Sequence, residues 1–233
     1  MTDFHSHVLP GIDDGSRNPD MSASLLRSAA EQGIRCICAT SHFYPTDERP
    51  ETFLKRRARA LEALQDVLEP DFPRIVPGAE VYYFAGISRV DAIGDLRIQG
   101  TPLLLLEMPF SEWSDSMVNE ILQLHRKPGV TVLMAHIERY LRWQKPEVWD
   151  ALLHSGVLMQ SNAEFFLSWR TRRRAIRMLR EGQIHLLGSD CHNTTSRPQK
   201  MGEALRAIGP EGRRILEENI ERFAPEFTPY AAV

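Results

Sequence analysis

The chain has 233 residues, of which 42% are hydrophobic and 25% are charged, and its formal net charge is −3 at pH 7. These values are typical of a globular protein that can bury a full core. The small negative charge argues against a general attraction to nucleic acid or to an anionic membrane surface. No apolar run is long enough to cross a bilayer, and a candidate ligand already at residue 5 leaves no room for a signal peptide. We therefore expect one domain over residues 1–233 without membrane insertion.

The three cysteines do not form the pattern of a disulfide framework. Cys36 and Cys38 are two residues apart in an apolar run, and Cys191 is distant in the sequence. Small buried cysteines of this kind are typical of a reduced protein, so we expect a cytoplasmic location.

Short apolar runs alternate with longer helical patterns along the whole chain. The predicted strands cover residues 2–6, 34–40, 74–80, 102–107, 130–136, 157–161 and 184–189. Several runs are almost continuously apolar, as in strands that are covered on both faces. The predicted helices cover residues 20–32, 50–69, 114–126, 146–155, 167–181, 199–208 and 211–223. About seven strand–helix units without a glycine-rich dinucleotide motif favour an α/β fold with a closed or nearly closed parallel barrel.

The opening stretch, Asp-Phe-His-Ser-His-Val-Leu-Pro-Gly-Ile-Asp-Asp-Gly-Ser, has the composition of a metal-binding segment. His5 and His7 are two residues apart, so on an extended strand both imidazoles point to the same side. A Pro-Gly pair ends the strand, and the adjacent carboxylates Asp13 and Asp14 follow in the loop. Because imidazole and carboxylate are the usual ligands of borderline and hard divalent cations, this stretch predicts part of a metal site.

Side chains that can bind metal stand at or just beyond the C-terminal end of nearly every predicted strand. In a parallel barrel these ends meet on one face, where active sites are built. The sixth strand is the exception, because it ends near Asn162. The candidate ligands are His5, His7, Asp14, His42, Glu80, Glu107, His136, Asp190 and His192. The remaining histidines lie within helix or strand patterns and are expected to be structural: His125, His154 and His185.

Nine ligands are too many for one cation, because tetrahedral zinc takes four and octahedral ions take six with water included. The sequence therefore predicts two or three ions on one face. A set of imidazoles and carboxylates without thiolate suits Mn²⁺, Fe²⁺ or Zn²⁺, and the pattern does not choose among them.

Two arginines are expected on the same face. Arg139 lies three residues beyond His136, and Arg197 lies five beyond His192. Clustered cations with two planar guanidinium groups suit a tetrahedral oxyanion, of which phosphate is the obvious example.

These motifs resemble those of the polymerase and histidinol phosphatase (PHP) superfamily of metal-dependent phosphoesterases. Within it, the opening segment and the motifs Ala-Thr-Ser-His, Gly-Ala-Glu, Ala-His-Ile-Glu-Arg-Tyr and Gly-Ser-Asp-Cys-His resemble the bacterial protein-tyrosine phosphatases of the capsule and exopolysaccharide type. The resemblance runs from Asp3 to about residue 220. It implies a distorted (β/α)7 barrel that holds three divalent metal ions, typically Mn²⁺.

The resemblance also implies a division of the ligands among the three ions. The implied sets are His5, His7, Glu80 and Asp190 for the first ion, Glu80 (bridging), Glu107 and His136 for the second, and Asp14, His42 and His192 for the third. Arg139 and Arg197 match the family's phosphate-binding arginines. Many other members of the superfamily have a histidine where this chain has Glu107.

The loop after His42 departs from the family pattern, because many relatives have a second histidine or a more basic stretch there. Phe43 and Tyr44 in this loop are expected either to pack against the substrate ring or to form ordinary packing at the barrel rim.

The function expected from this resemblance is hydrolysis of phosphotyrosine on proteins, with the tail of a bacterial tyrosine kinase as the implied partner. A hydroxide that bridges two metal ions is the expected nucleophile, since metal binding lowers the pKa of water toward about 7. A phenolic leaving group, with a pKa of about 10, needs less help from a general acid than a serine alcohol does.

Three alternatives remain. A phosphoesterase of the same superfamily that acts on histidinol phosphate or a nucleotide would use the same metals. An amidohydrolase-type hydrolase also opens with His-x-His, but it usually has a bridging lysine where this chain has Glu107. A non-catalytic metal-binding module would lack ligands, and here none is missing. The arginine-rich run at residues 169–180 is expected to be a solvated helix face and not a nucleic-acid site.

Overall fold

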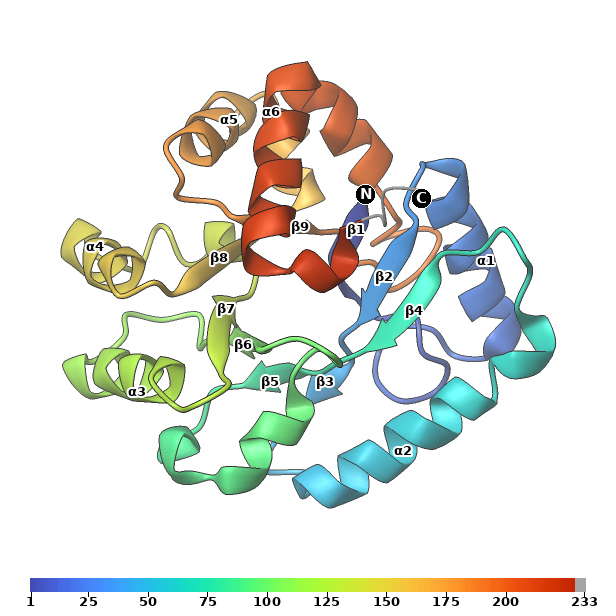
Figure 1. Cartoon of the computed structure of the whole chain (residues 1–233), viewed down its shortest axis with the longest axis horizontal. Helices are drawn as coiled ribbons and strands as arrows, with labels where there is room; N and C mark the ends of the chain where they lie inside the picture. Colours follow the sequence, from blue (N-terminus) through green and yellow to red (C-terminus); the bar gives the residue numbers. More distant parts are fainter. Residues whose placement is uncertain (229–233) are drawn as a thin grey trace.

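Parallel strands alternate with helices around a ring in the computed structural model, which describes residues 1–228 (Figure 1). The strands are β1 (Thr2–Ser6), β2 (Cys36–Ala39), β3 (His42–Phe43), β4 (Arg74–Pro77), β5 (Glu80–Tyr82), β6 (Leu103–Glu107), β7 (Thr131–Met134), β8 (Leu158–Asn162) and β9 (Leu186–Gly188). The α-helices are α1 (Pro19–Glu31), α2 (Pro50–Glu62), α3 (Asp115–His125), α4 (Pro146–His154), α5 (Arg172–Arg180) and α6 (Met201–Phe223). Short 3-10 segments are η1 (Gln65–Val67), η2 (Ile87–Arg89), η3 (Asp91–Leu96), η4 (Ile137–Arg139), η5 (Ala163–Phe166) and η6 (Pro225–Phe227).

Two of the strands are interrupted, and their halves pair as continuous neighbours. β2 pairs with β4, and β3, which follows β2 after two residues, pairs with β5. Across the interruption the Gly78 N–H donates to the Ala39 carbonyl at 2.9 Å, and the Glu80 N–H donates to the Ser41 carbonyl at 3.0 Å. β2 with β3, and β4 with β5, therefore each fill one position in the ring.

The strand ring closes between β9 and β1. The Asp190 N–H donates to the His5 carbonyl at 2.8 Å, and the His7 N–H donates to the Cys191 carbonyl at 2.9 Å. The other neighbours are β1 with β2, and β5 through β9 in chain order, all parallel. The predicted distorted barrel of seven strand positions is confirmed.

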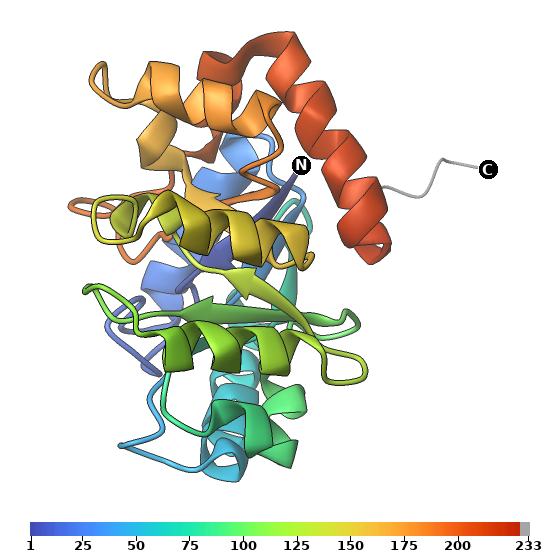
Figure 2. The ribbon, with the colours of Figure 1, turned by 90° about the vertical axis from the view of Figure 1, so that its left-hand side faces the viewer.

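Alternate residues of the strands belong to two separate apolar clusters. Leu104 and Leu106 of β6 pack in the cluster that includes the surrounding helices. Leu103 and Leu105 belong to a second cluster, which Phe227 joins after α6. Because side chains alternate across a strand, a run of four leucines fills both layers, which explains its lack of polar residues. Figure 2 shows the second half of α6 along one end of the barrel, on the same side as the N terminus.

Local signals set several helix ends. The Asn18 side chain accepts the Met21 N–H at 2.9 Å and caps α1, which begins at a proline. α6 spans the two predicted helices over 199–208 and 211–223, but its backbone is non-helical at Gly209, where φ is 70° and a proline follows. The predicted break is therefore present as a bend.

Three element predictions were wrong in detail. The predicted strand 74–80 is divided by the two residues between β4 and β5. The predicted helix 50–69 ends at Glu62, because the chain leaves the α-helical conformation, buries Leu64 and continues into the 3-10 segment η1. The predicted helix 167–181 starts only at Arg172, because the preceding η5 packs Phe165 and Phe166 onto the barrel.

Three further features of residues 1–228 bear on the sequence analysis. The arginines of α5 are exposed, whereas Ala175, Met178 and Leu179 are buried. The three cysteines are free and buried. Among the described helices, none combines the length and apolar character needed to span a bilayer.

Candidate metal centre

The structure brings all nine candidate ligands together on the face where the strands end. They come from β1 and the loop after it, from the starts of β3 and β5, from the end of β6, and from the segments that follow β7 and β9. Most are buried, and Asp14 is the exposed member, with 66% of its side chain open to solvent.

Glu80 lies at the centre of the cluster. One carboxylate oxygen, Oε2, lies 3.0 Å from His5 Nε2, 3.2 Å from His7 Nε2 and 3.0 Å from His42 Nδ1. The other oxygen, Oε1, lies 2.9 Å from His136 Nε2. A single carboxylate therefore contacts four imidazoles from three different segments of the chain.

A second carboxylate, Glu107, lies beside Glu80. Its Oε1 is 3.5 Å from His136 Nε2, and its Oε2 is 3.9 Å from His42 Nδ1. Glu107 and Tyr82 are paired across β6 and β5, so the strand register places this carboxylate beside the end of β5.

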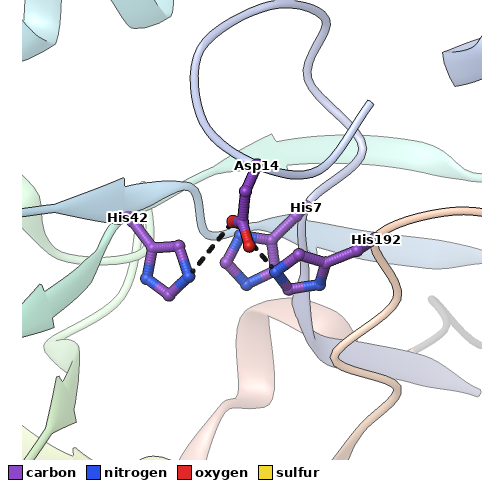
Figure 3. A group of neighbouring side chains, drawn as sticks. All are labelled: His7, Asp14, His42 and His192. Carbon is purple, nitrogen blue, oxygen red and sulfur yellow. Dashed lines mark ion pairs between the residues drawn. The ribbon is translucent and has the colours of Figure 1, made fainter. Parts of the chain in front are cut away.

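Asp14 closes the outer side of the cluster. Its Oδ1 lies 3.2 Å from His192 Nε2 and 3.5 Å from His42 Nε2, and the three side chains gather with His7 in Figure 3. One donor atom from each of these four residues lies within 4.8 Å of the others. This group combines three imidazoles with one carboxylate at the solvent side of the site.

Asp190 joins the cluster to both predicted arginines. Its carboxylate accepts hydrogen bonds from Arg139 and from Arg197, and from Asn162 Nδ2 at 2.8 Å. It also lies 3.7 Å from His5 Nε2. The two guanidinium groups, each about one-third exposed, therefore border the metal-ligand cluster as predicted.

Two site residues have left-handed backbone conformations. The φ angles are 29° for His136 and 53° for Asp190, and no other non-glycine residue of the described chain has a positive φ. Such conformations cost free energy in residues with a Cβ and are held by the surrounding structure. Each residue comes two positions after the end of a strand, so this backbone turn sets the direction of its side chain.

Two further residues, Asp13 and Gln160, hydrogen-bond to the candidate ligands but were not predicted to belong to the site. Asp13 Oδ2 lies 2.8 Å from His7 Nδ1 and accepts the His42 N–H at 3.0 Å. Gln160 Oε1 accepts the His136 N–H at 2.7 Å and lies 3.2 Å from His5 Nδ1. Two features of the sequence could have indicated these residues: Asp13 is adjacent to the candidate ligand Asp14, and Gln160 is a polar residue within an apolar strand.

Glycines make room for the histidines. A Cβ at Gly188 would lie 2.4 Å from the His5 Cβ and 2.8 Å from Gln160 Nε2. A Cβ at Gly15 would lie 2.3 Å from the His7 carbonyl oxygen. Both contacts are impossible for a real side chain, so neither site tolerates alanine without movement of a histidine.

Burial and neighbouring charges shift the pKa values of the buried histidines in opposite directions. Burial lowers the pKa of His7, but Asp13 and Glu80 outweigh it and raise the pKa to about 10. Burial likewise opposes a proton on His136, whose pKa is raised to about 9 by Glu107 and Glu80. His192 has its pKa lowered to about 4 by burial and by the neighbouring His7 and Arg197.

The arrangement of donor atoms fits divalent cations. His5 Nε2 and His7 Nε2 face each other at 3.1 Å. Four further buried atoms of the site have no hydrogen bond of suitable geometry within residues 1–228, although three of them lie close to other candidate ligands: His42 Nδ1, Glu80 Oε2, His136 Nδ1 and His192 Nε2. Buried polar atoms that make no hydrogen bond are rare, and closely spaced nitrogen and oxygen lone pairs are what a cation such as Mn²⁺, Fe²⁺ or Zn²⁺ requires.

Candidate ligands form three groups, and within each group one donor atom per residue lies within 4.8 Å of the others. They are His7, Asp14, His42 and His192; His5, His7 and Asp190; and His42, Glu80 and Glu107. These groups largely repeat the three predicted ligand sets. The main difference is that His42 joins Glu80 and Glu107, whereas His136 approaches the same two carboxylates from the other side.

The two aromatic residues after His42, Phe43 and Tyr44, have different surroundings. Phe43 is 1% exposed and packs on Phe53 with ring centroids 5.5 Å apart, which favours the alternative of ordinary packing at the barrel rim for this residue. The Tyr44 ring is stacked with His42 at 5.2 Å and is half-buried at the rim. Two of the three histidines expected to be structural hydrogen-bond to backbone groups: His125 Nδ1 accepts the Val132 N–H, and His185 Nδ1 accepts the Met159 N–H. The third, His154, is exposed at the end of α4, with its Nδ1 2.6 Å from the Asp150 carbonyl oxygen.

The fold and the cluster together define a parallel β/α barrel whose rim carries a candidate metal-binding site. The chain belongs to the family described as capsular polysaccharide synthesis, CpsB/CapC, whose model matches residues 1–223. This agrees with the resemblance to the capsule-type tyrosine phosphatases.

Named relatives of this chain are tyrosine-protein phosphatases. It is 31% identical over 230 residues to the tyrosine-protein phosphatase CpsB of Streptococcus pneumoniae, covering 89% of each chain. It is 29% identical over 232 residues to YwqE of Bacillus subtilis, covering 95% of this chain and 90% of the relative. A crystal structure from a study of YwqE and CpsB, which are described as metal-dependent tyrosine phosphatases, matches with a TM-score of 0.81 and 26% identity, over 97% of this chain and 94% of that chain.

Proposed function

We propose that this protein hydrolyses phosphotyrosine on proteins with the help of divalent cations held at the barrel rim. The observation that carries the proposal is the convergence of nine imidazole and carboxylate side chains beside the paired guanidinium groups of Arg139 and Arg197. The family and the named activity of the relatives support the same reaction and substrate class.

Three cations account best for the donor set. The proposed ligands are His5, His7, Glu80 and Asp190 for the first ion, Glu80, Glu107 and His136 for the second, and Asp14, His42 and His192 for the third. The mixed nitrogen and oxygen donors suit Mn²⁺, Fe²⁺ or Zn²⁺, and the family resemblance favours Mn²⁺ among them. When bound, such ions lower the pKa of coordinated water and polarise a phosphoryl oxygen.

Arg139 and Arg197 would hold the phosphate. Both guanidinium groups already converge on Asp190, and about one-third of each is exposed, so a phosphate entering from solvent meets two planar donors. Guanidinium groups bind phosphate oxygens with bidentate geometry and neutralise the charge that remains on them in the transition state. Asn162 would keep Asp190 in place when the arginines turn toward the phosphate.

The leaving group favours aryl esters. A tyrosine phenolate departs with a conjugate-acid pKa of about 10, so it needs little protonation in the transition state. An alkoxide from serine is far more basic and needs a general acid.

The partner that we propose is a phosphotyrosine protein, specifically the tail of a bacterial tyrosine kinase of capsule or exopolysaccharide synthesis. We also propose a cytoplasmic location and one functional domain over residues 1–233. The location is supported by the three free buried cysteines, which are typical of reducing compartments.

A substrate comparison tests this function. Protein depleted of metal with a chelator is reloaded with Mn²⁺, Fe²⁺ or Zn²⁺, and bound metal is measured together with hydrolysis of three substrates. We expect metal-dependent hydrolysis of a phosphotyrosine peptide, with much slower hydrolysis of the matching phosphoserine peptide and of histidinol phosphate. Preference for histidinol phosphate would replace this proposal with a small-molecule phosphoesterase, and metal binding without hydrolysis would favour a non-catalytic module.

A further inference from the structure

An exposed aromatic ring stands at the edge of the site without a role in metal or phosphate binding. Phe110 follows Glu107 by three residues in the loop between β6 and α3, and 47% of its side chain is exposed. Its ring centroid lies 6.0 Å from that of His136. Of the exposed large hydrophobic residues in the described chain, which are Leu68, Phe110, Trp143 and Trp169, only Phe110 has a ring contact with a candidate ligand.

A buried tyrosine supports the Phe110 ring. Phe110 is stacked on Tyr140, with centroids 5.6 Å apart and planes inclined by 25°. Tyr140 is fully buried, and its hydroxyl accepts the Met108 N–H at 3.0 Å. One face of the Phe110 ring therefore packs on Tyr140, and the exposed part of the ring is open to a ligand.

The loop around Phe110 is also fixed on its other side. The Trp113 indole N–H donates to the Pro109 carbonyl at 3.0 Å, and its backbone N–H donates to Gln144 Oε1 at 3.1 Å. The Trp113 ring meets Tyr140 edge-on at 5.1 Å. A ring positioned in advance loses little conformational entropy when it binds a ligand.

We infer that Phe110 is the specificity-determining residue that binds the aromatic ring of the substrate while its phosphate lies at Arg139 and Arg197. The inference rests on the proposed function. Phe110 contacts His136, and Arg139 follows His136 by three residues at the end of η4, so the inference places both side chains against the same ligand. Two aromatic rings stack favourably at centroid separations of about 4.5–7 Å, an interaction that phosphoserine cannot make.

Tyr44 is the competing ring, and its surroundings favour Phe110. Tyr44 is already stacked on His42 and contacts Tyr82 at 5.7 Å, and it is only partly exposed. Phe110 is 47% exposed, so it offers more open apolar surface to a ligand than Tyr44 does.

The test compares an aryl ligand with an alkyl ligand in the same protein. In Mn²⁺-loaded wild type, Phe110→Ala and Phe110→Leu, we would measure kcat/KM for phosphotyrosine and phosphoserine peptides of one sequence, and the affinities for benzylphosphonate and methylphosphonate by calorimetry. Phe110→Ala should lower the aryl-to-alkyl ratio about tenfold in both assays, with Phe110→Leu intermediate. Bound metal should stay unchanged. Trp169→Ala, which removes an exposed ring elsewhere, should leave both ratios unchanged.

The outcomes separate this inference from the proposed function. An unchanged ratio in both Phe110 variants, or a ratio that falls in Tyr44→Ala and not in Phe110→Ala, would overturn the role of Phe110. If Phe110→Ala does not fold, the leucine variant decides, because it keeps the apolar bulk and removes the ring. A metal-loaded wild type that hydrolyses no aryl phosphate would instead refute the proposed function.

Discussion

Asp13 Oδ2 lies 2.8 Å from Nδ1 of His7, so the outer nitrogen of this imidazole is occupied and its Nε2 is aimed at Glu80 and Asp190. The same carboxylate oxygen accepts the backbone N–H of His42 at 3.0 Å. One buried carboxylate thereby orients two candidate ligands from different segments. Burial opposes the negative charge of Asp13, but the adjacent His7 outweighs this and holds the pKa of Asp13 well below its usual range.

Removal of this orienting carboxylate should weaken metal binding without unfolding the barrel. We expect Asp13→Ala to lower Mn²⁺ affinity by about 10–100-fold, the usual effect of losing a group that positions a metal ligand. Asp13→Asn should lose less, because an amide oxygen still accepts from the imidazole and from His42. Titration calorimetry with Mn²⁺ measures the effect, and the exposed Asp71→Ala serves as the matched control. An Asp13→Ala protein with wild-type affinity would contradict the orienting role.

The two arginines should affect turnover and not metal content. We expect Arg139→Ala and Arg197→Ala each to lower kcat by about 10²–10³-fold, because each removes a donor that stabilises charge on the phosphate in the transition state. Bound metal, measured by elemental analysis, should equal that of wild type. Arg142→Ala, an exposed arginine three residues beyond Arg139, should retain full activity. Loss of metal from the Arg139 or Arg197 variant would show that the arginines support the ligands and do not bind phosphate.

The left-handed backbone at His136 predicts an unusual order of stabilities. We expect both His136→Ala and His136→Gly to lose phosphatase activity, since each removes a proposed ligand. The glycine variant should nevertheless be more stable than the alanine variant by about 1 kcal/mol, because glycine adopts a positive φ without steric cost. Denaturant unfolding of the metal-free variants measures the difference. An alanine variant that is the more stable of the two would show that the backbone at this position is unstrained.

His185 should make the protein sensitive to acid. Burial, with a smaller effect of Arg222, lowers the pKa of His185 to about 4 from its usual 6.5. The unfolded chain therefore binds this proton at a higher pH than the folded chain, so stability is retained above pH 6.5 and falls as the pH drops toward 4. Between pH 7.5 and 4.5 the loss from this group is about 2 kcal/mol.

His185→Asn isolates that contribution. Both proteins are unfolded in chelator at the two pH values, so that titration of the metal site affects them alike. The asparagine variant should lose about 2 kcal/mol less than wild type over this interval. Equal losses would show that His185 is protonated as readily in the folded protein as in the unfolded chain.

Much of the fold could be predicted from local patterns. Leu103–Leu106 lacks polar residues because this strand is covered on both sides, and such runs identify the strands of a parallel barrel. Asn18 and the proline after it marked the start of α1. The interruptions between β2 and β3, and between β4 and β5, could not be predicted, because they depend on how neighbouring strands curl to close the ring.

The candidate site was predictable to a similar extent. His5, Glu107 and Asp190 lie at or near the ends of strands, and parallel strands present these ends on one face, so their convergence followed from topology alone. Their roles as ligands stay a prediction. The sequence could not predict that Asp13 points inward to His7 while Asp14 stays exposed beside His192, since two adjacent identical residues give no indication of which one turns inward.

The sequence by itself determined the order of strands and helices, the barrel class and the set of side chains at its rim, because these depend on residue spacing and apolar pattern. Only the tertiary structure decided that Arg139 and Arg197 converge on Asp190, and that Gln160 links His5 to His136. These contacts join segments far apart in the chain. Their geometry depends on the path of several loops packed together, which no single stretch of sequence specifies.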